Sequence, residues 1–378
     1  MSPGFLPHES FHNSVADINR GYFVHHDIHK ASTLPSGFYR DEALFRASAD
    51  KIFATTWQYI GDKSLVPLEA YAYPFTLLEH LLAEPLVLTR DQDGKLHCLS
   101  NVCTHRGHIV VLNPGRQKRL TCGYHGRCFA LDGQFRSMPA FENVENFPTH
   151  GDHLPRLPLT EWGPFVFTSL RPAFPLEAFL EEMNRRIGFL PVESFAYDSS
   201  RSKDYLVNAH WALYCDNYLE GFHIPFVHKD LDAAIESETY ETVLFDHGSL
   251  QIGYTTNPGE AFSLPVDHPD AGRQVAAYYF WLFPNIMFNF YPWGLSLNIV
   301  QPIRPDRTRV MFRTWISDPS RLDSGAGAQL DKVEREDELV VENVFRGMQS
   351  SLYTSGRFSP SKEKGVHHFH RLLSESMQ

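Results

Sequence analysis

The stretch "NVCTHRGHIVVLNPGRQKRLTCGYHGRCFALDG", residues 101–133, decides how the rest of the sequence is interpreted. It holds three of the five cysteines and three of the 20 histidines of the chain. Two short pairs lie inside it, Cys103-x-His105 and Cys122-x2-His125. Thiolate and neutral imidazole are ligands that soft and borderline metals prefer, so the two pairs predict a four-ligand metal site.

Two kinds of metal site fit these four ligands. A structural zinc site is one alternative, but its pairs are usually Cys-x2-4-Cys and His-x3-5-His. Here each pair joins one cysteine to one histidine. That arrangement suits two irons, and replacing two thiolates by histidines raises the reduction potential of a [2Fe–2S] cluster. The pattern therefore favours a site that carries electrons.

The segments "CTHRGH" and "CGYHG" resemble those of the Rieske oxygenase family. The resemblance implies a Rieske [2Fe–2S] cluster in which Cys103 and Cys122 hold one iron, and His105 and His125 hold the other. It also implies that oxygen chemistry takes place at a second metal further along the chain.

Three positions in the same stretch refine this interpretation. Rieske proteins of respiratory complexes carry an extra cysteine pair that cross-links the two cluster loops, whereas His108 and Tyr124 stand at the corresponding places here. The oxygenase subtype therefore fits better. Arg127 stands where the family usually has tryptophan after "YHG". Two interpretations of Arg127 stay open, an effect on docking or cluster electrostatics and a tolerated surface change.

A second motif, "CDNYLEGFHIPFVH" (residues 215–228), combines two histidines with a carboxylate. The overlapping segment "NAHWALYCDNYLEGFH" predicts an amphipathic helix on which Glu220 and His223 share a face. Pro225 is predicted to end that helix, so that His228 turns back toward the same point. Two histidines and one carboxylate form the facial triad of non-haem Fe(II) oxygenases. The alternative is two histidines packed among aromatic residues.

The carboxylate of this triad is expected from a later helix. Residues 330–350, "LDKVEREDELVVENVFRGMQS", predict a long charged amphipathic helix. Spacing alone leaves Glu334, Glu336 and Glu338 as rivals. The resemblance of "EDELVVENVFRGM" to the iron-binding helix of the family implies that Asp337 is the ligand.

The resemblance also assigns roles next to the metals. It implies that Glu220 is no ligand but links His223 to the cluster histidine His125 of a neighbouring subunit. Asn217 is a candidate for tuning the pocket, and equally a polar residue on a helix face. We assign no ligand to the "HHFH" run near the C-terminus, His367, His368 and His370.

The order of expected elements predicts an α+β protein. Residues 40–54 predict a helix, and the short strand-like runs that follow, with "RDQDGK" as a hairpin turn, predict an all-β unit. Residues 276–305 predict strands of a large twisted antiparallel sheet covered by helices, of the helix-grip type. We predict three parts: an N-terminal helical segment (1–55) that packs with the catalytic domain, a Rieske domain (56–170) and a catalytic domain (171–378).

The composition excludes several classes of protein. With 34 basic and 45 acidic residues and no basic block, nucleic-acid binding is not expected. No apolar run approaches the roughly 18 residues that a membrane span needs. The first 20 residues lack the pattern of a signal peptide, so we predict a cytoplasmic protein. The remaining cysteines are predicted to be buried free thiols: Cys98, Cys128 and Cys215.

Within the family the resemblance is strongest to the group that contains choline and carnitine monooxygenases. The segments "CDNYLEGFHIPFVH" and "FPNIMFNFYPWG" and the "HHFH" tail carry it. It implies a homotrimeric terminal oxygenase that receives electrons from a separate NAD(P)H-dependent flavin and iron–sulfur reductase. Its mononuclear Fe(II) would be held by His223, His228 and Asp337.

The implied substrate is a small quaternary ammonium compound such as choline, carnitine or a betaine, which is hydroxylated, cleaved at a C–N bond or demethylated. Such cations are recognised by aromatic side chains. Two alternatives stay open, an oxygenase for an aromatic ring or its substituent, and an electron-transfer protein without a second iron. Aromatic stripes in a strand more often belong to the core than to a cage. The candidates for either place are Trp211, Tyr214, Tyr218, Phe280, Trp281, Phe288, Tyr291 and Trp293.

Overall fold

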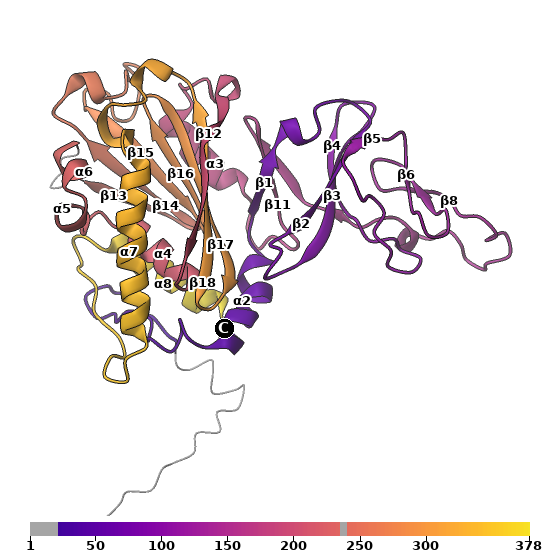
Figure 1. The fold of residues 1–378 in the computed structure, drawn as a ribbon, viewed down its shortest axis with the longest axis horizontal. Helices are drawn as coiled ribbons and strands as arrows, with labels where there is room; N and C mark the ends of the chain where they lie inside the picture. The colour runs from indigo at the N-terminus through magenta and orange to yellow at the C-terminus, as the bar shows by residue number, and fades with distance from the viewer. Residues whose placement is uncertain (1–21, 235–239) are drawn as a thin grey trace, which may run out of the picture.

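A seven-stranded antiparallel sheet organises the C-terminal half of the chain. In the computed structural model, which describes residues 22–234 and 240–378, its strand order is β12-β18-β17-β16-β15-β14-β13 (Figure 1). Every residue of β14, β15 and β16 is buried, because both faces of the sheet are covered. The strands span Ala196–Val207 (β12), Glu241–Phe245 (β13), Gly248–Tyr254 (β14), Val275–Leu282 (β15), Ile286–Tyr291 (β16), Gly294–Arg304 (β17) and Arg307–Ile316 (β18).

The two faces of this sheet build two hydrophobic cores. Neighbouring residues of a strand point to opposite faces, so Trp281 packs with helices α2, α4, α7 and α8. Phe280 packs on the other side with helix α3 and strands β10 and β11. The helices span Glu42–Ser48 (α2), Glu177–Ile187 (α3), Trp211–Tyr218 (α4), Ile224–Val227 (α5), Lys229–Ala234 (α6), Leu330–Met348 (α7) and Lys364–Ser376 (α8).

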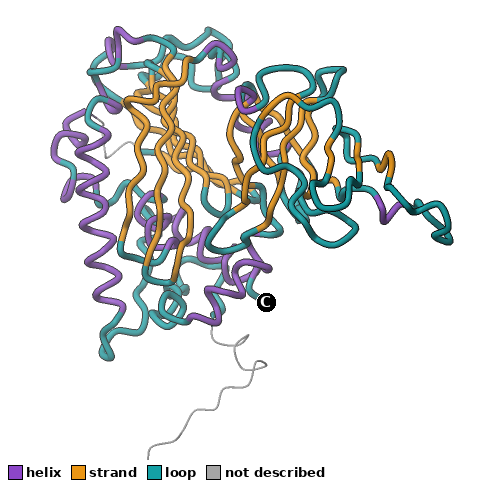
Figure 2. Tube along the Cα trace, turned by 45° about the vertical axis from the view of Figure 1, so that its right-hand side comes forward, coloured by secondary structure: helices purple, strands orange, loops and turns teal. Residues whose placement is uncertain are grey.

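Short strands build a second unit beside the large sheet. Figure 2 shows that this unit consists almost entirely of strands and loops, whereas most helices surround the large sheet. Its sheets have the orders β5-β2-β3-β4-β9, β6-β7-β8 and β1-β11-β10. The strands span Gln58–Asp62 (β1), Tyr71–Leu77 (β2), Glu84–Arg90 (β3), Leu96–Ser100 (β4), Gly115–Arg116 (β5), Leu120–Thr121 (β6), Cys128–Phe129 (β7), Phe135–Ser137 (β8), Arg156–Leu157 (β9), Leu159–Trp162 (β10) and Phe165–Thr168 (β11).

Most predicted elements are confirmed. The helix expected over residues 40–54 is α2, continued by a π-helical turn, η1 (Ala49–Phe53). The expected hairpin joins β3 to β4, and the long charged helix is α7. All five cysteines are buried and free, as predicted for the three outside the metal pattern. Short 3-10 turns are Lys63–Leu65 (η2), His150–Asp152 (η3), Val192–Ser194 (η4), Pro258–Glu260 (η5), Pro319–Arg321 (η6) and Gly325–Gly327 (η7).

The helix predicted to run through Glu220 and His223 is wrong. Helix α4 ends at Tyr218, and the Glu220 carboxylate instead accepts the backbone N–H groups of Phe222 and His223 in the following turn. Pro225 does not end a helix. It lies in the first turn of α5, where its missing N–H leaves no hydrogen bond unmade.

The predicted division into residues 1–55, 56–170 and 171–378 stays a prediction, and residues 1–21 of its first part lie outside the described residues. Within the described ranges, no helix combines the length and the apolar character needed to cross a membrane.

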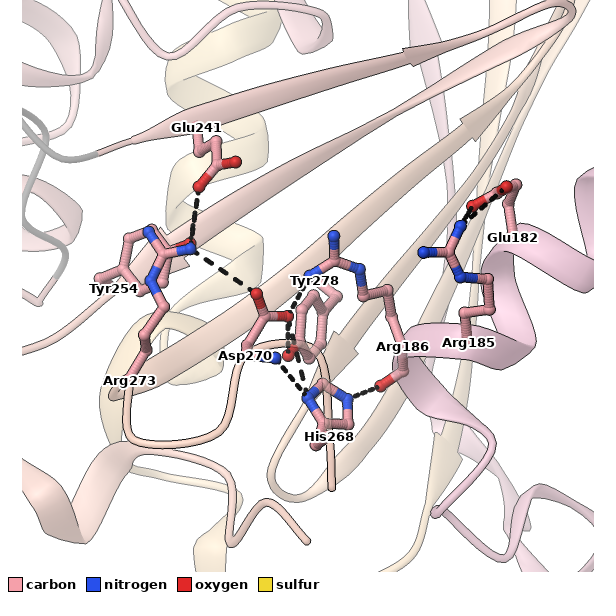
Figure 3. Close-up of polar contacts among 9 residues, drawn as sticks. All are labelled: Glu182, Arg185, Arg186, Glu241, Tyr254, His268, Asp270, Arg273 and Tyr278. Atoms are coloured by element: carbon pink, nitrogen blue, oxygen red, sulfur yellow. Dashed lines mark hydrogen bonds and ion pairs between the residues drawn. The ribbon is translucent and has the colours of Figure 1, made fainter. Parts of the chain in front are cut away.

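A buried polar network ties α3 to the large sheet (Figure 3). The Asp270 side chain is only 3% exposed and accepts hydrogen bonds from Arg186 of α3 and, at 2.8 Å, from the Tyr278 hydroxyl of β15. The ring of His268 joins the same network, accepting from the backbone N–H of Asp270. Burial alone would raise the pKa of Asp270, but the hydrogen bonds from Arg186 and Tyr278 outweigh it and lower this pKa.

We predict that Asp270→Asn lowers the free energy of unfolding by about 3 kcal/mol, because Arg186 loses its ion-pair partner in a largely buried place. The depressed pKa means that this stabilisation is present near neutral pH and is lost as the pH falls below about 4. Urea denaturation at pH 7 measures the change. The matched control is Arg185→Gln, whose pair with Glu182 on the same helix is exposed and contributes less than about 1 kcal/mol. Equal effects of the two substitutions would contradict the prediction.

Candidate metal centres and the cavity beside them

The predicted cluster ligands lie on two loops that share one backbone pattern. In the first loop the Cys103 N–H donates to the carbonyl of His108, and in the second the Cys122 N–H donates to the carbonyl of Arg127, both at 2.8 Å. Each loop turns back through a glycine with positive φ, 69° in the first and 75° in the second. Glycine adopts that conformation without steric cost, so both loops hold their cysteine and histidine in the same tight turn.

The four side chains of these loops gather at one end of the all-β unit. The Cys103 and Cys122 thiols are buried, and the rings of His105 and His125 lie 4.8 Å apart. The Nδ1 atom of His105 is buried and has no hydrogen-bond partner. A buried nitrogen without a partner is costly, and a metal ion would satisfy it. Two thiols and two imidazoles placed in this way fit a [2Fe–2S] cluster of the mixed-ligand type.

Arg127 is not a surface residue. The interpretation of Arg127 as a tolerated surface change is wrong, because its side chain is 2% exposed and forms an ion pair with Asp152. His108 and Tyr124 stand where respiratory Rieske proteins have the extra cysteines. His108 is half-buried, Tyr124 is exposed, and their ring centroids lie 5.9 Å apart.

A second group of possible metal ligands consists of His223, His228 and Asp337. Each offers one ligand atom, and these atoms all lie within 4.8 Å of one another. The Oδ1 atom of Asp337 lies 2.9 Å from Nε2 of His228 and 3.6 Å from Nε2 of His223. The histidines flank α5 and the carboxylate comes from α7, so the site forms only when these two segments pack together.

Carboxylates orient both rings toward this point. Glu220 lies 2.6 Å from Nδ1 of His223, and Glu336 lies 2.8 Å from Nδ1 of His228. Each ring therefore turns its Nε2 atom toward Asp337. This is how metal-binding histidines are usually held.

The geometry separates Asp337 from its three rivals. Glu336 lies behind His228, and Glu334 bonds the Tyr214 hydroxyl instead. Among the residues that the structure describes, no group of three or more possible metal ligands includes Glu338. Asn217, the other predicted site residue, donates from Nδ2 to Oδ1 of Asp337 at 2.6 Å.

A cavity of about 100 Å³ lies against the second group. Tyrosine is the commonest residue in its wall, and no lysine or arginine lines it among the described residues. Tyr279 contacts Tyr291 edge-on at 5.8 Å and Tyr240 at 6.3 Å, measured between ring centroids. The tyrosines of the wall are Tyr214, Tyr218, Tyr240, Tyr279 and Tyr291.

The floor of the cavity is a row of polar side chains on neighbouring strands of the large sheet. Gln251 of β14 pairs with Tyr279 of β15, which pairs in turn with Asn289 of β16, and all three line the cavity. Tyr218 holds the end of α4 on this row, since its hydroxyl donates to Asn289 and its carbonyl accepts from Gln251, each at 2.8 Å. Ser296 of β17 continues the row.

One carboxylate oxygen in the cavity wall has no partner. Glu334 is 2% exposed; its Oε2 atom accepts the Tyr214 hydroxyl, whereas its Oε1 atom is buried without any hydrogen bond. Burial raises the pKa of Glu334 well above its ordinary value, and the neighbouring charge of Asp337 adds to this. A carboxylate in this position favours a cation in the cavity, because a buried negative charge needs compensation.

The sequence left several residues of this region open and gave no indication of others. Tyr240 and Tyr279 were missed, although polar residues at alternate positions in apolar strands are a signal of such a cavity. Glu334, considered as a rival metal ligand, lines the cavity. The "HHFH" histidines have other partners, for example the carbonyl of His25 for His367 and Asp216 for His370. Four of the candidate cage residues lie in the two hydrophobic cores instead, Trp211, Phe280, Trp281 and Phe288, while Trp293 stacks on Tyr291 from behind.

Comparison with known proteins gives matches in both halves of the chain. Residues 56–148 match the Rieske [2Fe–2S] domain, and residues 190–378 match the ring hydroxylating alpha subunit (catalytic domain). The chloroplastic choline monooxygenase of Arabidopsis thaliana is 31% identical over 93% of this chain and 84% of its own length. The carnitine monooxygenase oxygenase subunit of Escherichia coli (strain K12) is 27% identical over 92% and 94%.

Solved structures show the same fold. The quaternary ammonium Rieske monooxygenase CntA in complex with its substrate L-carnitine superposes with a TM-score of 0.70 at 23% identity, over 92% of this chain and 96% of that one. Naphthalene 1,2-dioxygenase with indole in its active site gives a TM-score of 0.66 at 16% identity, over 92% of both chains.

We predict that Asp337→Ala lowers the metal content from about three ions per chain to about two, because one of three ligands is lost from the second group. Metal analysis of the purified protein measures the number of iron ions per chain. The visible absorption of the same sample shows whether the cluster at the loops of Cys103 and Cys122 is retained. Glu338→Ala is the control on the same helix and should leave the metal content unchanged. Loss of metal from the control alone would show that the ligand was assigned to the wrong acid.

Proposed function

The chain belongs to the family of ring hydroxylating α subunits with a Rieske [2Fe–2S] domain, and we propose that it oxidises a small quaternary ammonium compound. It is an oxidoreductase whose cofactors are a Rieske cluster and a mononuclear iron. Subunits of this kind take electrons from a separate reductase, here proposed to be an NAD(P)H-dependent flavin and iron–sulfur protein.

We assign the cofactors to the two groups of side chains described above. Cys103 and Cys122 would hold one iron of the cluster through their thiolates. The ring nitrogens of His105 and His125 would hold the other iron. The mononuclear iron is assigned to a third group of ligands, His223, His228 and Asp337.

The chain's own residues prepare the catalytic centre. When bound, the mononuclear iron supplies the activation of O2, and the cluster supplies electrons. Glu220 fixes the ring of His223, and the amide of Asn217 fixes the carboxylate of Asp337. His223, His228 and Asp337 all line the cavity. A substrate bound in the cavity would therefore lie next to the metal ligands, in position to react.

The unpaired Glu334 carboxylate in a tyrosine-lined cavity carries the proposal for the substrate. A quaternary ammonium group has no N–H to donate, so aromatic faces and a negative charge are what can recognise it. The cavity offers both. A neutral aromatic substrate could not favour the ionised form of Glu334 and would gain no electrostatic attraction from it, which disfavours the ring-oxidising alternative.

The same wall discriminates among cations. A substrate with its own carboxylate, such as carnitine or a betaine, would find no lysine or arginine in the described wall. We therefore propose a choline-like cation without a carboxylate. One oxygen atom of O2 enters a C–H bond and the other leaves as water, with two electrons from the reductase and two protons. Where that C–H lies next to the quaternary nitrogen, the carbinol collapses to an aldehyde and an amine.

Electron delivery is proposed to cross between subunits of a homotrimer. Figure 1 shows β6, which precedes Cys122, and α5, which lies between the two histidines, at opposite ends of the long axis of the chain. The cluster histidine His125 is exposed, as is Tyr124, whose ring centroid lies 3.8 Å from that of His125, and Leu112 is a further exposed apolar residue of the segment that holds both loops. An exposed ligand with apolar neighbours suits docking against Glu220 of another subunit. The cytoplasmic location stays a prediction.

The substrate assignment predicts substrate-dependent O2 uptake with choline-like cations and none with aromatic acids, when the protein is coupled to a reductase. Glu334→Gln should raise KM for the cation about tenfold or more, because a buried charge pair is lost, and leave kcat nearly unchanged. Glu338→Gln is the matched control on α7 and should leave KM as it is. Turnover of aromatic acids, or an unchanged KM in Glu334→Gln, would contradict the assignment.

If electrons cross between subunits, two variants that are each inactive should regain activity when they are combined in one assembly. Cys103→Ser removes the cluster, and Asp337→Ala removes the mononuclear iron, so neither chain turns over alone. Co-expressed with different tags and purified as mixed assemblies, they should regain part of the wild-type rate of O2 uptake. Mixed assemblies that stay inactive would show that electrons do not pass between subunits.

A further inference from the structure

Arg127 occupies a slot built for a large apolar side chain. It lies two residues after His125, where the family usually has tryptophan, and its guanidinium is enclosed by three aromatic rings. The distances from its central carbon to the ring centroids are 5.8 Å for Phe129, 5.1 Å for Phe135 and 5.4 Å for Phe147. A charge inside such a slot is costly unless it is paired, and therefore calls for an explanation.

The partner of this charge is Asp152. The Nη2 atom of Arg127 donates to Oδ1 of Asp152 at 2.5 Å and to its main-chain carbonyl at 3.2 Å. The Nε atom of Arg127 is buried without a partner. The other oxygen of Asp152 accepts the backbone N–H and the hydroxyl of Thr149, which fixes the carboxylate in place.

The same carbonyl connects Arg127 to the first cluster loop. The hydroxyl of Thr104 donates to the main-chain oxygen of Asp152 at 2.9 Å. Thr104 stands between Cys103 and His105, whereas Arg127 closes the second loop through its own carbonyl. Asp152 therefore receives one donor from each loop, and the two loops are tied together by hydrogen bonds. This clasp, Thr104–Asp152–Arg127, joins the loops that a disulfide joins in respiratory Rieske proteins.

The clasp also sets a charge beside the cluster. The Arg127 guanidinium is largely shielded from water, so its field is screened less than that of the exposed Arg106 in the first loop. Reduction adds one negative charge to a cluster, and a fixed positive charge nearby stabilises the reduced form. Charge and hydrogen bonding around a cluster are known determinants of its potential.

We propose that Arg127 and Asp152 tune the Rieske cluster of this chain, with the guanidinium raising its reduction potential and the carboxylate lowering it. This rests on the proposed cluster ligands. Arg127 acts as a positioning and charge-setting residue, since it touches the loops and not the irons. Because Arg127 lies at the cluster loops and not at the cavity, we expect it to affect the reduction potential of the cluster and not the binding of substrate.

A spectroscopic redox titration of the purified protein tests this, with Arg127→Met and Asp152→Asn as opposite perturbations. Arg127→Met should lower the equilibrium constant for reduction about tenfold, which is 59 mV for one electron. Asp152→Asn keeps the carbonyl that Thr104 uses, removes the negative charge and should raise the potential. Arg106→Gln is the control for an exposed arginine and should shift the potential much less.

Opposite shifts in the two variants would support the proposal, because mere loosening of the loops would move both in the same direction. Shifts of one sign, or no shift, would overturn it. Should Arg127→Met fail to retain its cluster, the direction of the shift in Asp152→Asn decides alone. A wild-type protein without the spectrum of a [2Fe–2S] cluster would instead refute the ligand assignment, which separates the two failures.

Discussion

The carboxylate of Asp337 is the contact on which the catalytic half of the structure depends. One of its oxygens meets the ring of His228 and the amide of Asn217, and so joins α7 to the segment from α4 to α5. Glu220 and Glu336 hold the same histidines from behind. Three carboxylates thus surround two imidazoles, an excess of negative charge that a divalent cation would compensate. A metal ion held at this place, as we propose, would therefore help to make the packing favourable.

Much of this arrangement is predictable from the sequence where the information is local. Each cysteine–histidine pair lies within one tight loop, so spacing alone predicts these four residues as candidate ligands. The acids of α7 are different, because successive residues of a helix point about 100° apart and only packing decides which one meets His228. The end of α4 was also missed, although Gly221 marks it. A Cβ there would meet the Tyr240 ring at 2.9 Å, so the turn brings a cavity residue close to the backbone.

Alternating polar residues can signal a cavity, but which residues line it could not be predicted, because the lining depends on strand register. Gln251, Tyr279 and Asn289 are far apart in the sequence and become neighbours only when β14, β15 and β16 pair. A shift of one residue in any pairing would turn these side chains to the opposite face, into the aromatic core around Phe280. The apolar residues that alternate with the polar row therefore fix its position, and the core determines the shape of the site.

The unpaired oxygen of Glu334 has a thermodynamic consequence for the free protein. Because burial raises its pKa, this side chain keeps its proton to a higher pH than an ordinary glutamate when no cation is near. A cation that enters the cavity favours the ionised form, so binding is coupled to the release of that proton to solvent. The apparent affinity for the cation then increases with pH until the pH reaches the raised pKa of Glu334. Protons therefore compete with the substrate for this side chain.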